Sequence, residues 1–526
     1  MPVMKFPRYL ALIWAAAWLP CIAAAQGVPG STSRPASRPN ILLVTVDDLS
    51  CDSIGAFGCK LPGTSPNVDQ LAAEGLRFAY AHVHTGACAP SRNAILSGRY
   101  PHNNGVEGFY QVRNINYPVM ADLMRVGGYF VGIRHKVSHS TPYHPYQWDL
   151  VLDQAPDGTR RHGKDAASYG ESVRQGIAAA RAAGKPFCLN INVADPHKPF
   201  HAEGRRGETI ADPHAPSRVF TPEEVVVPGF LPDDPVVRKE LAHYYSSVRR
   251  ADDGVGEILK ALAKSGEAER TVVVFLSDHG MPLPFAKTQV YHHSSRTPLI
   301  VRWPSVTRAG ATDQRHMVQG VDLLPTLLDI AGIEHPKGLD GRTILPLLKG
   351  DELDGRDMVF KEHNENSGGH RNPMRAVQTK TQLYIFNPWS NGTRVMGTAT
   401  NGTNTYRRMK ELAKSDPAIA ARLKLADYRV PEELYDVSRD PDCLHNLIDD
   451  PGSRAEIDRL RGELEAWMKR TNDPLLESFQ KRADPAVREA YVKKQETESA
   501  QRQAAEPRRN EPGGGRRNRR AAEAEE

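Results

Sequence analysis

The 526-residue sequence predicts an α/β fold in which helices flank a large mixed, mostly parallel sheet, followed by a smaller C-terminal α+β subdomain. Two observations predict this class. Continuous apolar runs of strand length alternate with helical patterns, and such runs are typical of strands buried on both faces of a sheet. After about Leu348 the pattern changes to short strand-like segments and one amphipathic helix.

The predicted elements follow one another in a regular order. The first apolar run, residues 41–46, comes directly after Asn40, and similar runs span residues 187–193, 271–276 and 299–303. A helical pattern at residues 244–264 precedes the third run, which favours a doubly wound layered sheet. In the C-terminal part, residues 376–387 and 433–436 predict short antiparallel strands, and residues 454–470 predict an amphipathic helix.

The two ends of the chain differ in composition from its body. Lys5 and Arg8 precede an apolar run, and small residues at 23–25 offer a cleavage point, which together predict a signal peptide too short to span a membrane. We therefore expect an exported protein, periplasmic or secreted, or lysosomal in a eukaryote, without stable membrane association. The predicted divisions are a signal peptide at 1–25, a linker at 26–39, a catalytic domain at 40–370, a C-terminal subdomain at 371–480 and a disordered charged tail at 481–526.

Charge and cysteine content exclude some functions and leave some pairings open. The net charge is +5, and the tail contributes twelve Lys/Arg against nine Asp/Glu, so the body is close to neutral. Because no basic stripe marks the body, we do not expect nucleic-acid binding. Cys51 and Cys59 are close enough in sequence to bridge, Cys188 lies in an apolar run, and the pairing of these three with Cys443 stays open.

One cysteine lies in a segment suited to chemistry. Cys88-Ala89-Pro90-Ser91-Arg92 is followed by an apolar pair and by Ser97-Gly98, which predicts the start of a helix. Backbone N–H groups on the first turn of a helix stabilise an anion. Taken alone, the segment fits a small buried cysteine or half of a disulfide equally well.

Acidic and basic side chains follow the predicted strands. Asp47 and Asp48 end the first run, and Asp278-His279 follow the third, so all four are expected at the carboxyl edge of the sheet, where α/β proteins bind ligands. Oxygen ligands there suit Ca²⁺, with Mg²⁺ as an alternative, although Asp47-Asp48 could also form an exposed turn. Further candidates are Lys136, His139, His197 and Lys287, each of which could also be an ordinary surface residue.

These motifs, in this order, resemble the sulfatase family, whose signature is Cys-x-Pro-x-Arg followed after four residues by Ser/Thr-Gly. The resemblance implies an alkaline-phosphatase-like fold and oxidation of Cys88 to formylglycine by a formylglycine-generating enzyme. It also implies that the hydrated aldehyde attacks sulfur, and that Asp47, Asp48, Cys88, Asp278 and His279 hold the metal. Many sulfatases have Asn at the position of His279, and imidazole is a poorer partner for Ca²⁺ than an amide oxygen.

The resemblance also assigns roles to the basic residues. It implies that Arg92, Lys136 and Lys287 bind the sulfate oxygens, and that His197 protonates the leaving group. His139 would take the proton from the second hydroxyl of the aldehyde hydrate. Many family members space this lysine and histidine by two residues instead of three, so His135 is the alternative to His139.

The substrate is predicted from a resemblance within the family. Residues 280–288, 372–377 and 433–436 look most like heparan N-sulfatases, which act on N-sulfoglucosamine, whereas Lys136-x-x-His139 and Asp278-His279-Gly280 also resemble iduronate 2-sulfatases. The expected partner is a sulfated polysaccharide or oligosaccharide. Another glycan O-sulfatase, a phosphonate or phosphate monoester hydrolase, and a catalytically silent glycan-binding module are the alternatives.

Polar residues of a glycine-rich segment are further candidates for substrate binding. We expect Glu362, His363 and Arg375 to lie in loops rimming the pocket, where arginine favours sugars that carry carboxylates or further sulfates. A flexible polar linker is the alternative interpretation of this segment.

Overall fold

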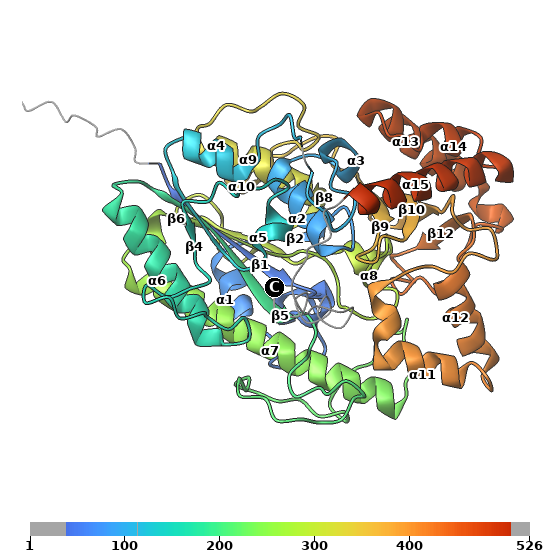
Figure 1. The fold of residues 1–526 in the computed structure, drawn as a ribbon, viewed down its shortest axis with the longest axis horizontal. Coiled ribbons are helices and arrows are strands. Elements are labelled where there is room, and N and C mark those ends of the chain that lie inside the picture. The colour runs from blue at the N-terminus through green and yellow to red at the C-terminus, as the bar shows by residue number, and fades with distance from the viewer. Residues whose placement is uncertain (1–37, 113, 506–526) are drawn as a thin grey trace, which may run out of the picture. The chain divides into compact units, whose positions relative to one another are not determined.

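The computed structural model describes residues 38–112 and 114–505 (Figure 1). The predicted signal peptide and residues 26–37 of the predicted linker lie outside the described residues. The described chain contains one large sheet and one small sheet, which confirms the predicted fold class.

The large sheet has eight strands in the order β4-β3-β5-β1-β6-β7-β2-β8. Neighbours from β4 through β6 pair in parallel, β7 runs antiparallel to both β6 and β2, and β2 pairs in parallel with β8. The apolar run at 299–303 therefore forms the strand that points against its neighbours. The strands are β1 (Asn40–Asp47), β2 (Leu76–His82), β3 (Phe130–Arg134), β4 (Leu150–Val151), β5 (Phe187–Pro196), β6 (Thr271–Ser277), β7 (Leu299–Arg302) and β8 (Ala311–Gln319).

Helices cover both faces of this sheet (Figure 1). Among those in the part of the chain around the large sheet, α6 and α7 pack together against β5, while α4 lies beside β3 and α9 on the other face. The helices of this part are α1 (Pro66–Glu74), α2 (Cys88–Ser97), α3 (Pro101–Asn104), α4 (Met120–Val126), α5 (Val137–Ser140), α6 (Ala166–Ala182), α7 (Pro235–Lys264), α8 (His292–Ser295), α9 (Leu323–Ala331) and α10 (Leu345–Lys349).

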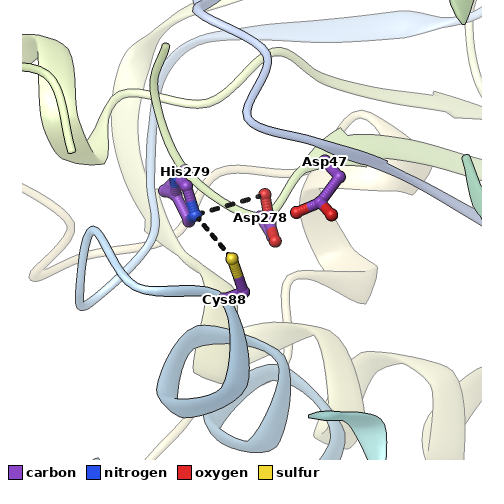
Figure 2. A group of neighbouring side chains, drawn as sticks. All are labelled: Asp47, Cys88, Asp278 and His279. Atoms are coloured by element: carbon purple, nitrogen blue, oxygen red, sulfur yellow. Dashed lines mark hydrogen bonds and ion pairs between the residues drawn. The ribbon is translucent and has the colours of Figure 1, made fainter. Parts of the chain in front are cut away.

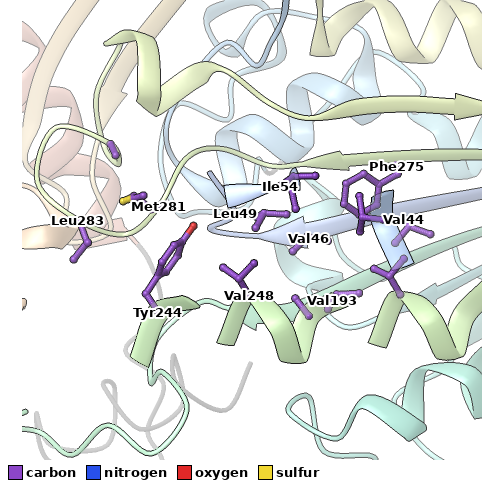
Figure 3. Close-up of a cluster of buried hydrophobic side chains, with 14 of the residues drawn as sticks. Val44, Val46, Leu49, Ile54, Val193, Tyr244, Val248, Phe275, Met281 and Leu283 are labelled. Carbon is purple, nitrogen blue, oxygen red and sulfur yellow. The ribbon is translucent and has the colours of Figure 1, made fainter. Parts of the chain in front are cut away.

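The central strand β1 shows why a continuous apolar run forms here. Its side chains alternate between the two faces, so that Leu42, Val44 and Val46 join the core beneath α7, and Ile41 and Leu43 join the core beneath α9. Figure 3 shows Val46 above Val248 of α7, with Val44 further along the strand near Phe275 in the same core. Full burial of each such side chain stabilises the fold by about 1.5–3 kcal/mol. Both faces of β1 are therefore mostly apolar, with the buried Thr45 as a polar exception, and the acidic residues come only where the strand ends.

The small sheet is antiparallel, in the order β12-β11-β10-β9. Its strands are β9 (Met358–Glu365), β10 (Arg371–Thr379), β11 (Gln382–Phe386) and β12 (Glu432–Asp436), and its helices are α11 (Asn404–Leu412), α12 (Pro417–Tyr428), α13 (Arg454–Thr471), α14 (Leu476–Gln480) and α15 (Pro485–Ala505). Trp467 of α13 stacks on Phe360 of β9 with ring centroids 5.1 Å apart. The boundary predicted between residues 370 and 371 divides the paired strands β9 and β10.

The prediction of a disordered tail from residue 481 is wrong for its first half, because α15 is an ordered helix. Its sequence is mostly polar, but three side chains at helical spacing are buried, namely Val492, Gln495 and Ser499. Ser499 Oγ donates to Glu365 Oε2 at 2.9 Å, and Arg502 also donates to this carboxylate. The remainder of the predicted tail, residues 506–526, lies outside the described residues.

The described part of the chain contains neither a disulfide nor a helix that could span a membrane. All five cysteines in this part of the chain are free, so Cys51 and Cys59 form no disulfide, and Cys188 lies fully buried in the core. Among the described helices, none combines the length and the apolar character needed to cross a bilayer.

Candidate active site

A buried cluster forms where β1 and β6 end and α2 begins (Figure 2). Asp47 is the last residue of β1, Asp278 follows β6, and the register that pairs Val46 with Ser277 brings the two carboxylates together. Ligand atoms of Asp47, Cys88, Asp278 and His279 all lie within 4.8 Å of one another. Sheet register and the start of one helix thus bring together four residues from three parts of the sequence.

Cys88 is the first residue of α2, a helix whose residues are all buried. Its Sγ lies 3.2 Å from Nε2 of His279, and only 2% of the residue is exposed. Burial raises the pKa of the Cys88 thiol well above its usual value, Lys287 opposes this effect, and Asp47 and Asp278 add to it. Because the thiolate is the nucleophilic form of cysteine, an unmodified Cys88 is a poor nucleophile in this setting.

Arg92 lies one turn further along α2 and connects the carboxylates. Its Nη2 is 2.9 Å from Asp278 Oδ2 and 3.5 Å from Asp47 Oδ1. Its Nη1 donates to Asn192 Oδ1 at 2.5 Å, and Asn192 Nδ2 donates to the backbone oxygens of Arg134 and His135 at 3.1 and 2.8 Å. The buried Asn192 therefore joins Arg92 to the turn that carries Lys136.

That turn aims a lysine at the first carboxylate. His135 and Lys136 both have left-handed backbone angles, with φ of 60° and 54°. Lys136 Nζ lies 2.9 Å from Asp47 Oδ2. Burial lowers the pKa of Lys136, but the charge and hydrogen bond of Asp47, together with Cys88, outweigh burial, and the net shift is upward. Lys136 is therefore held in its charged form beside Asp47.

Asp48 and Lys287 form a second buried pair. Lys287 Nζ lies 2.7 Å from both carboxylate oxygens of Asp48, and His279 Nε2 lies 3.1 Å from Asp48 Oδ1. Burial raises the pKa of Asp48, but Lys287, His197 and His279 together outweigh burial, and the pKa falls below its usual value. Lys287 therefore belongs to the cluster, and Asp48 is not an exposed turn.

The three candidate histidines differ in their surroundings. His139 and His135 both have Lys136 and Asp47 as charged neighbours, and burial lowers the pKa of each well below the usual value. His139 also has His197 as a neighbour, its ring packs edge-on against Phe109, and its buried Nδ1 has no partner among the described residues. His139 thus lies nearer to the other candidate histidine, and both rings are neutral at neutral pH.

His197 is held by a separate network. Its Nδ1 donates to the backbone oxygen of Lys198 at 2.7 Å, which leaves Nε2 as the atom free for proton exchange. Lys164 Nζ donates to the backbone oxygen of His197 at 2.6 Å and to Asp195 Oδ1 at 2.8 Å. Burial lowers the pKa of His197 to about 4, although Asp48 opposes it.

The donor set of the cluster fits a divalent cation. Neither carboxylate oxygen of Asp47 accepts a hydrogen bond within the described chain, although both are fully buried. His279 Nδ1 donates to the oxygen of Gly280 at 3.0 Å, so Nε2 presents its lone pair toward Asp48 and Cys88. Carboxylate oxygens are the ligands that Ca²⁺ and Mg²⁺ prefer, so the residues fit such an ion, with His279 as the one nitrogen donor.

The predicted substrate residues do not lie in rim loops, and this prediction is wrong. Glu362 and His363 are on β9 and Arg375 is on β10, and all three are fully buried. Only residues 366–370 form the turn between these strands. Glu362 and Arg375 pair across the two strands, whereas neither ring nitrogen of His363 has a partner among the described residues. The apolar alternation expected of strands is therefore missing here.

Glu362 and Arg375 belong to a buried ionic network. Glu362 Oε2 lies 2.5 Å from His102 Nδ1 and 3.6 Å from Arg375 Nε, and Arg375 donates to Asp473 Oδ2 at 2.5 Å. Burial lowers the pKa of His102, but Glu362 outweighs it and raises the pKa to about 9. The guanidinium and the imidazolium balance the two carboxylates, so the network is a closed set of ion pairs.

Sequence reasoning missed Asn192, Lys164, His102 and Asp473. A signal for Asn192 was present, because it is a polar residue inside the apolar run at 187–193, where an amide needs a specific partner. Lys164, His102 and Asp473 lie outside the predicted strands, and their partners are distant in sequence, so no local pattern marks them.

Comparisons with known proteins agree with this arrangement. A family model described as Sulfatase matches residues 39–333. The chain is 29% identical over 480 residues to N-sulphoglucosamine sulphohydrolase of Homo sapiens, which covers 83% of this chain and 91% of that protein. It is 28% identical over 453 residues to an ulvan-active sulfatase of Formosa agariphila, which covers 85% of this chain and 83% of that protein.

One solved structure illustrates the likeness of the fold. A 2-O GAG sulfatase superposes on the chain with a TM-score of 0.61 at 20% sequence identity, over 86% of this chain and 96% of that one. At this identity the likeness concerns the fold alone.

Proposed function

The chain belongs to the sulfatase family, and from this membership we propose that it hydrolyses sulfate from sulfated glycans, with Cys88 converted to formylglycine. The names of its relatives support the substrate class, since they describe action on N-sulphoglucosamine, ulvan and a GAG. The observation that carries the proposal is the buried convergence of Cys88, Asp47, Asp278 and His279 beside three cationic side chains.

The proposed roles follow from the charge of the substrate. A sulfate monoester carries negative charge on its peripheral oxygens, so its displacement requires cations around them and an acid at the leaving atom. Arg92, Lys136 and Lys287 supply three of these cations, and Asp47, Asp48 and Asp278 keep them charged and in place. When present, the formylglycine hydrate and a Ca²⁺ or Mg²⁺ ion supply the nucleophile and additional positive charge.

Two histidines are assigned the proton transfers. His197 keeps its Nδ1 proton on the oxygen of Lys198, so Nε2 is the atom that delivers a proton to the leaving group. The sulfate ester brings negative charge close to this ring, which favours its protonated form. His139 has an unpartnered Nδ1 beside Lys136, and we assign it the opposite role, that of proton acceptor.

The finer substrate assignment is also part of this proposal. The chain is similar to N-sulphoglucosamine sulphohydrolase over most of the length of both proteins, which supports N-sulfoglucosamine as the substrate unit. A 2-O-sulfated iduronate or another O-sulfated sugar is the competing assignment. We further propose that the protein is exported, to the periplasm or outside the cell, and that a formylglycine-generating enzyme matures it.

Peptide mass spectrometry and sulfate-release assays on one preparation test the proposal. We expect the peptide spanning Cys88 to carry an aldehyde in place of the thiol, and release from an N-sulfated standard to exceed that from 2-O- and 6-O-sulfated standards. Cys88→Ala and Cys88→Ser should abolish release and leave the melting temperature nearly unchanged.

A matched control and a second ester complete the design. Cys59→Ser removes another free thiol, outside the cluster, and should retain full activity. A phosphonate monoester assayed in parallel distinguishes the related hydrolase activity. Active enzyme with an ordinary Cys88 thiol, or substantial turnover by Cys88→Ala, would show that the proposal is wrong.

A further inference from the structure

A polar cavity lies between α15 and the turn that joins β9 to β10. Its volume is about 250 Å³, below the ~300–1,000 Å³ of pockets for drug-sized ligands, so it suits a ligand of one ring. Six of its lining residues carry polar side chains that the argument uses: His370, Arg371, Asn372, Arg394, Ser499 and Gln503. The cavity exists because α15 is ordered.

The lining of the cavity includes N–H donors that have no hydrogen-bond partner among the described residues. Asn372 is only 4% exposed, and its Oδ1 accepts a hydrogen bond from the backbone nitrogen of Gly397 at 3.1 Å. Its Nδ2 has no partner among the described residues, so both of its N–H donors are available to a ligand in the cavity that Asn372 lines. The Nε of Arg371, another lining residue, is buried and has no partner among the described residues, and a buried donor of this kind points to a ligand with hydrogen-bond acceptors.

The charges around the cavity are already balanced. Arg394 pairs with Glu489 at 2.6 Å and with Glu496 at 3.3 Å, and Arg371 pairs with Glu107 at 2.7 Å. An inorganic anion therefore finds no unpaired cation here. Val395 and Ala500 add apolar surface to the lining, so the cavity combines hydrogen-bond donors with an apolar patch, as a neutral, hydroxyl-bearing sugar ring requires.

Both sides of the cavity connect to the candidate active site. Arg371 binds Glu107, two residues before Phe109, whose ring contacts His139. On the other side, Asn372 binds Gly397, and the nearby Ala399 nitrogen donates to the side chain of Thr288, the residue after Lys287. The segments that border the cavity are thus the same segments that touch His139 and adjoin Lys287.

We infer that this cavity binds a neighbouring sugar ring of the glycan whose sulfate is removed at the Cys88 site. The inference rests on the proposed function for its substrate class. The inference gives α15 a role in binding the glycan chain, although the composition of this segment predicted disorder.

Binding to the full-length Cys88→Ala protein tests the inference without turnover. Calorimetric titration compares an N-sulfated monosaccharide with a tetrasaccharide that carries the same sulfated end. We expect the tetrasaccharide to bind at least about tenfold more tightly, since one or two additional hydrogen bonds contribute about 1.4 kcal/mol.

Variants locate that additional affinity. Asn372→Asp keeps the acceptor for Gly397 and removes the two donors, and Gln503→Ala removes an amide from α15. Each should cost about tenfold in tetrasaccharide affinity and leave monosaccharide affinity unchanged. Lys494→Ala is the matched control, because Lys494 lies on α15 away from the cavity and pairs with Glu498.

Two results would overturn the inference: equal affinity for the two sugars, or tetrasaccharide affinity that Asn372→Asp and Gln503→Ala leave unchanged. Sulfate release from the monosaccharide by protein with intact Cys88 is measured separately. Loss of that release contradicts the proposed function, while the titrations still decide the role of the cavity.

Discussion

At the scale of single residues, Asn192 controls the placement of two cations. Its carbonyl oxygen accepts a hydrogen bond from Arg92, and its NH₂ group donates to the backbone oxygens of the two residues before Lys136. His135 and Lys136 occupy left-handed backbone angles that cost about 1 kcal/mol or more each, so the turn needs such support. Asn192 is therefore a positioning residue for Arg92 and Lys136.

Replacing Asn192 should lower the turnover number more than it changes the Michaelis constant. Asn192→Leu frees both Arg92 and the Lys136 turn, and a displacement of about 1 Å typically costs about 100-fold in rate. Steady-state sulfate release measures the effect. Asn190→Leu removes an equally buried amide two residues earlier on the same face of β5, without a bond to either cation, and serves as the control. Equal losses in the two variants would contradict the positioning role.

At the scale of elements, the sequence predicted the large sheet well because β1, β5 and β6 are buried on both faces. Their apolar runs revealed both the strands and, at their ends, Asp47, Asp48 and Asp278. Prediction failed where polar residues are buried in pairs. Glu362 and Arg375 sit in strands because ion pairs across β9 and β10 replace apolar contacts. In α15, charged residues outnumber the three that anchor it.

The short helix α8 contains a pH-sensitive connection between distant elements. His293 Nδ1 lies 2.8 Å from Asp52, and Nε2 lies 3.0 Å from Asp442, which follows β12. Burial alone would lower the pKa of His293, but the two carboxylates outweigh it and raise the pKa to about 9. A folded-state pKa above the unfolded value of about 6.5 means that the stabilisation is complete below pH 6.5 and is lost as the pH rises through about 9.

We therefore expect His293→Gln to lower the free energy of unfolding by roughly 2–3 kcal/mol at pH 6 and by much less at pH 9.5. Urea denaturation at the two pH values measures this difference. His445→Gln removes an exposed imidazole 3.5 Å from Asp440 and should have little effect at either pH. A loss for His293→Gln that is the same at both pH values would exclude the proposed linkage.

At the scale of the whole molecule, the candidate metal site connects the large sheet to helix α2. Asp47 is the last residue of β1, Cys88 is the first residue of α2 and Asp278 directly follows β6, so a bound cation would tie three elements together. Occupation of this site should therefore stabilise the folded chain as a whole, in addition to any effect on turnover.

Calcium should raise the melting temperature of metal-depleted protein, and a chelator should reverse the effect. Ligand at about 100 times its dissociation constant stabilises the folded state by about 2.7 kcal/mol. Differential scanning calorimetry of Asp47→Asn should show most of this gain lost, because the substitution removes a charged oxygen ligand from the buried cluster. Asp233→Asn, a neutralised surface carboxylate, should keep the full shift. A shift of the same size in both variants would place the ion elsewhere.

The burial of Cys88 determines whether its proposed modification comes before or after folding. Once α2 has packed against the rest of the molecule, all of its residues are buried. A maturation enzyme can then no longer bind the peptide around Cys88. The aldehyde proposed at Cys88 would therefore have to be installed on the nascent, still extended chain. A host that lacks this enzyme during synthesis would accumulate a well-folded but inert protein, and later treatment of the purified product could not activate it.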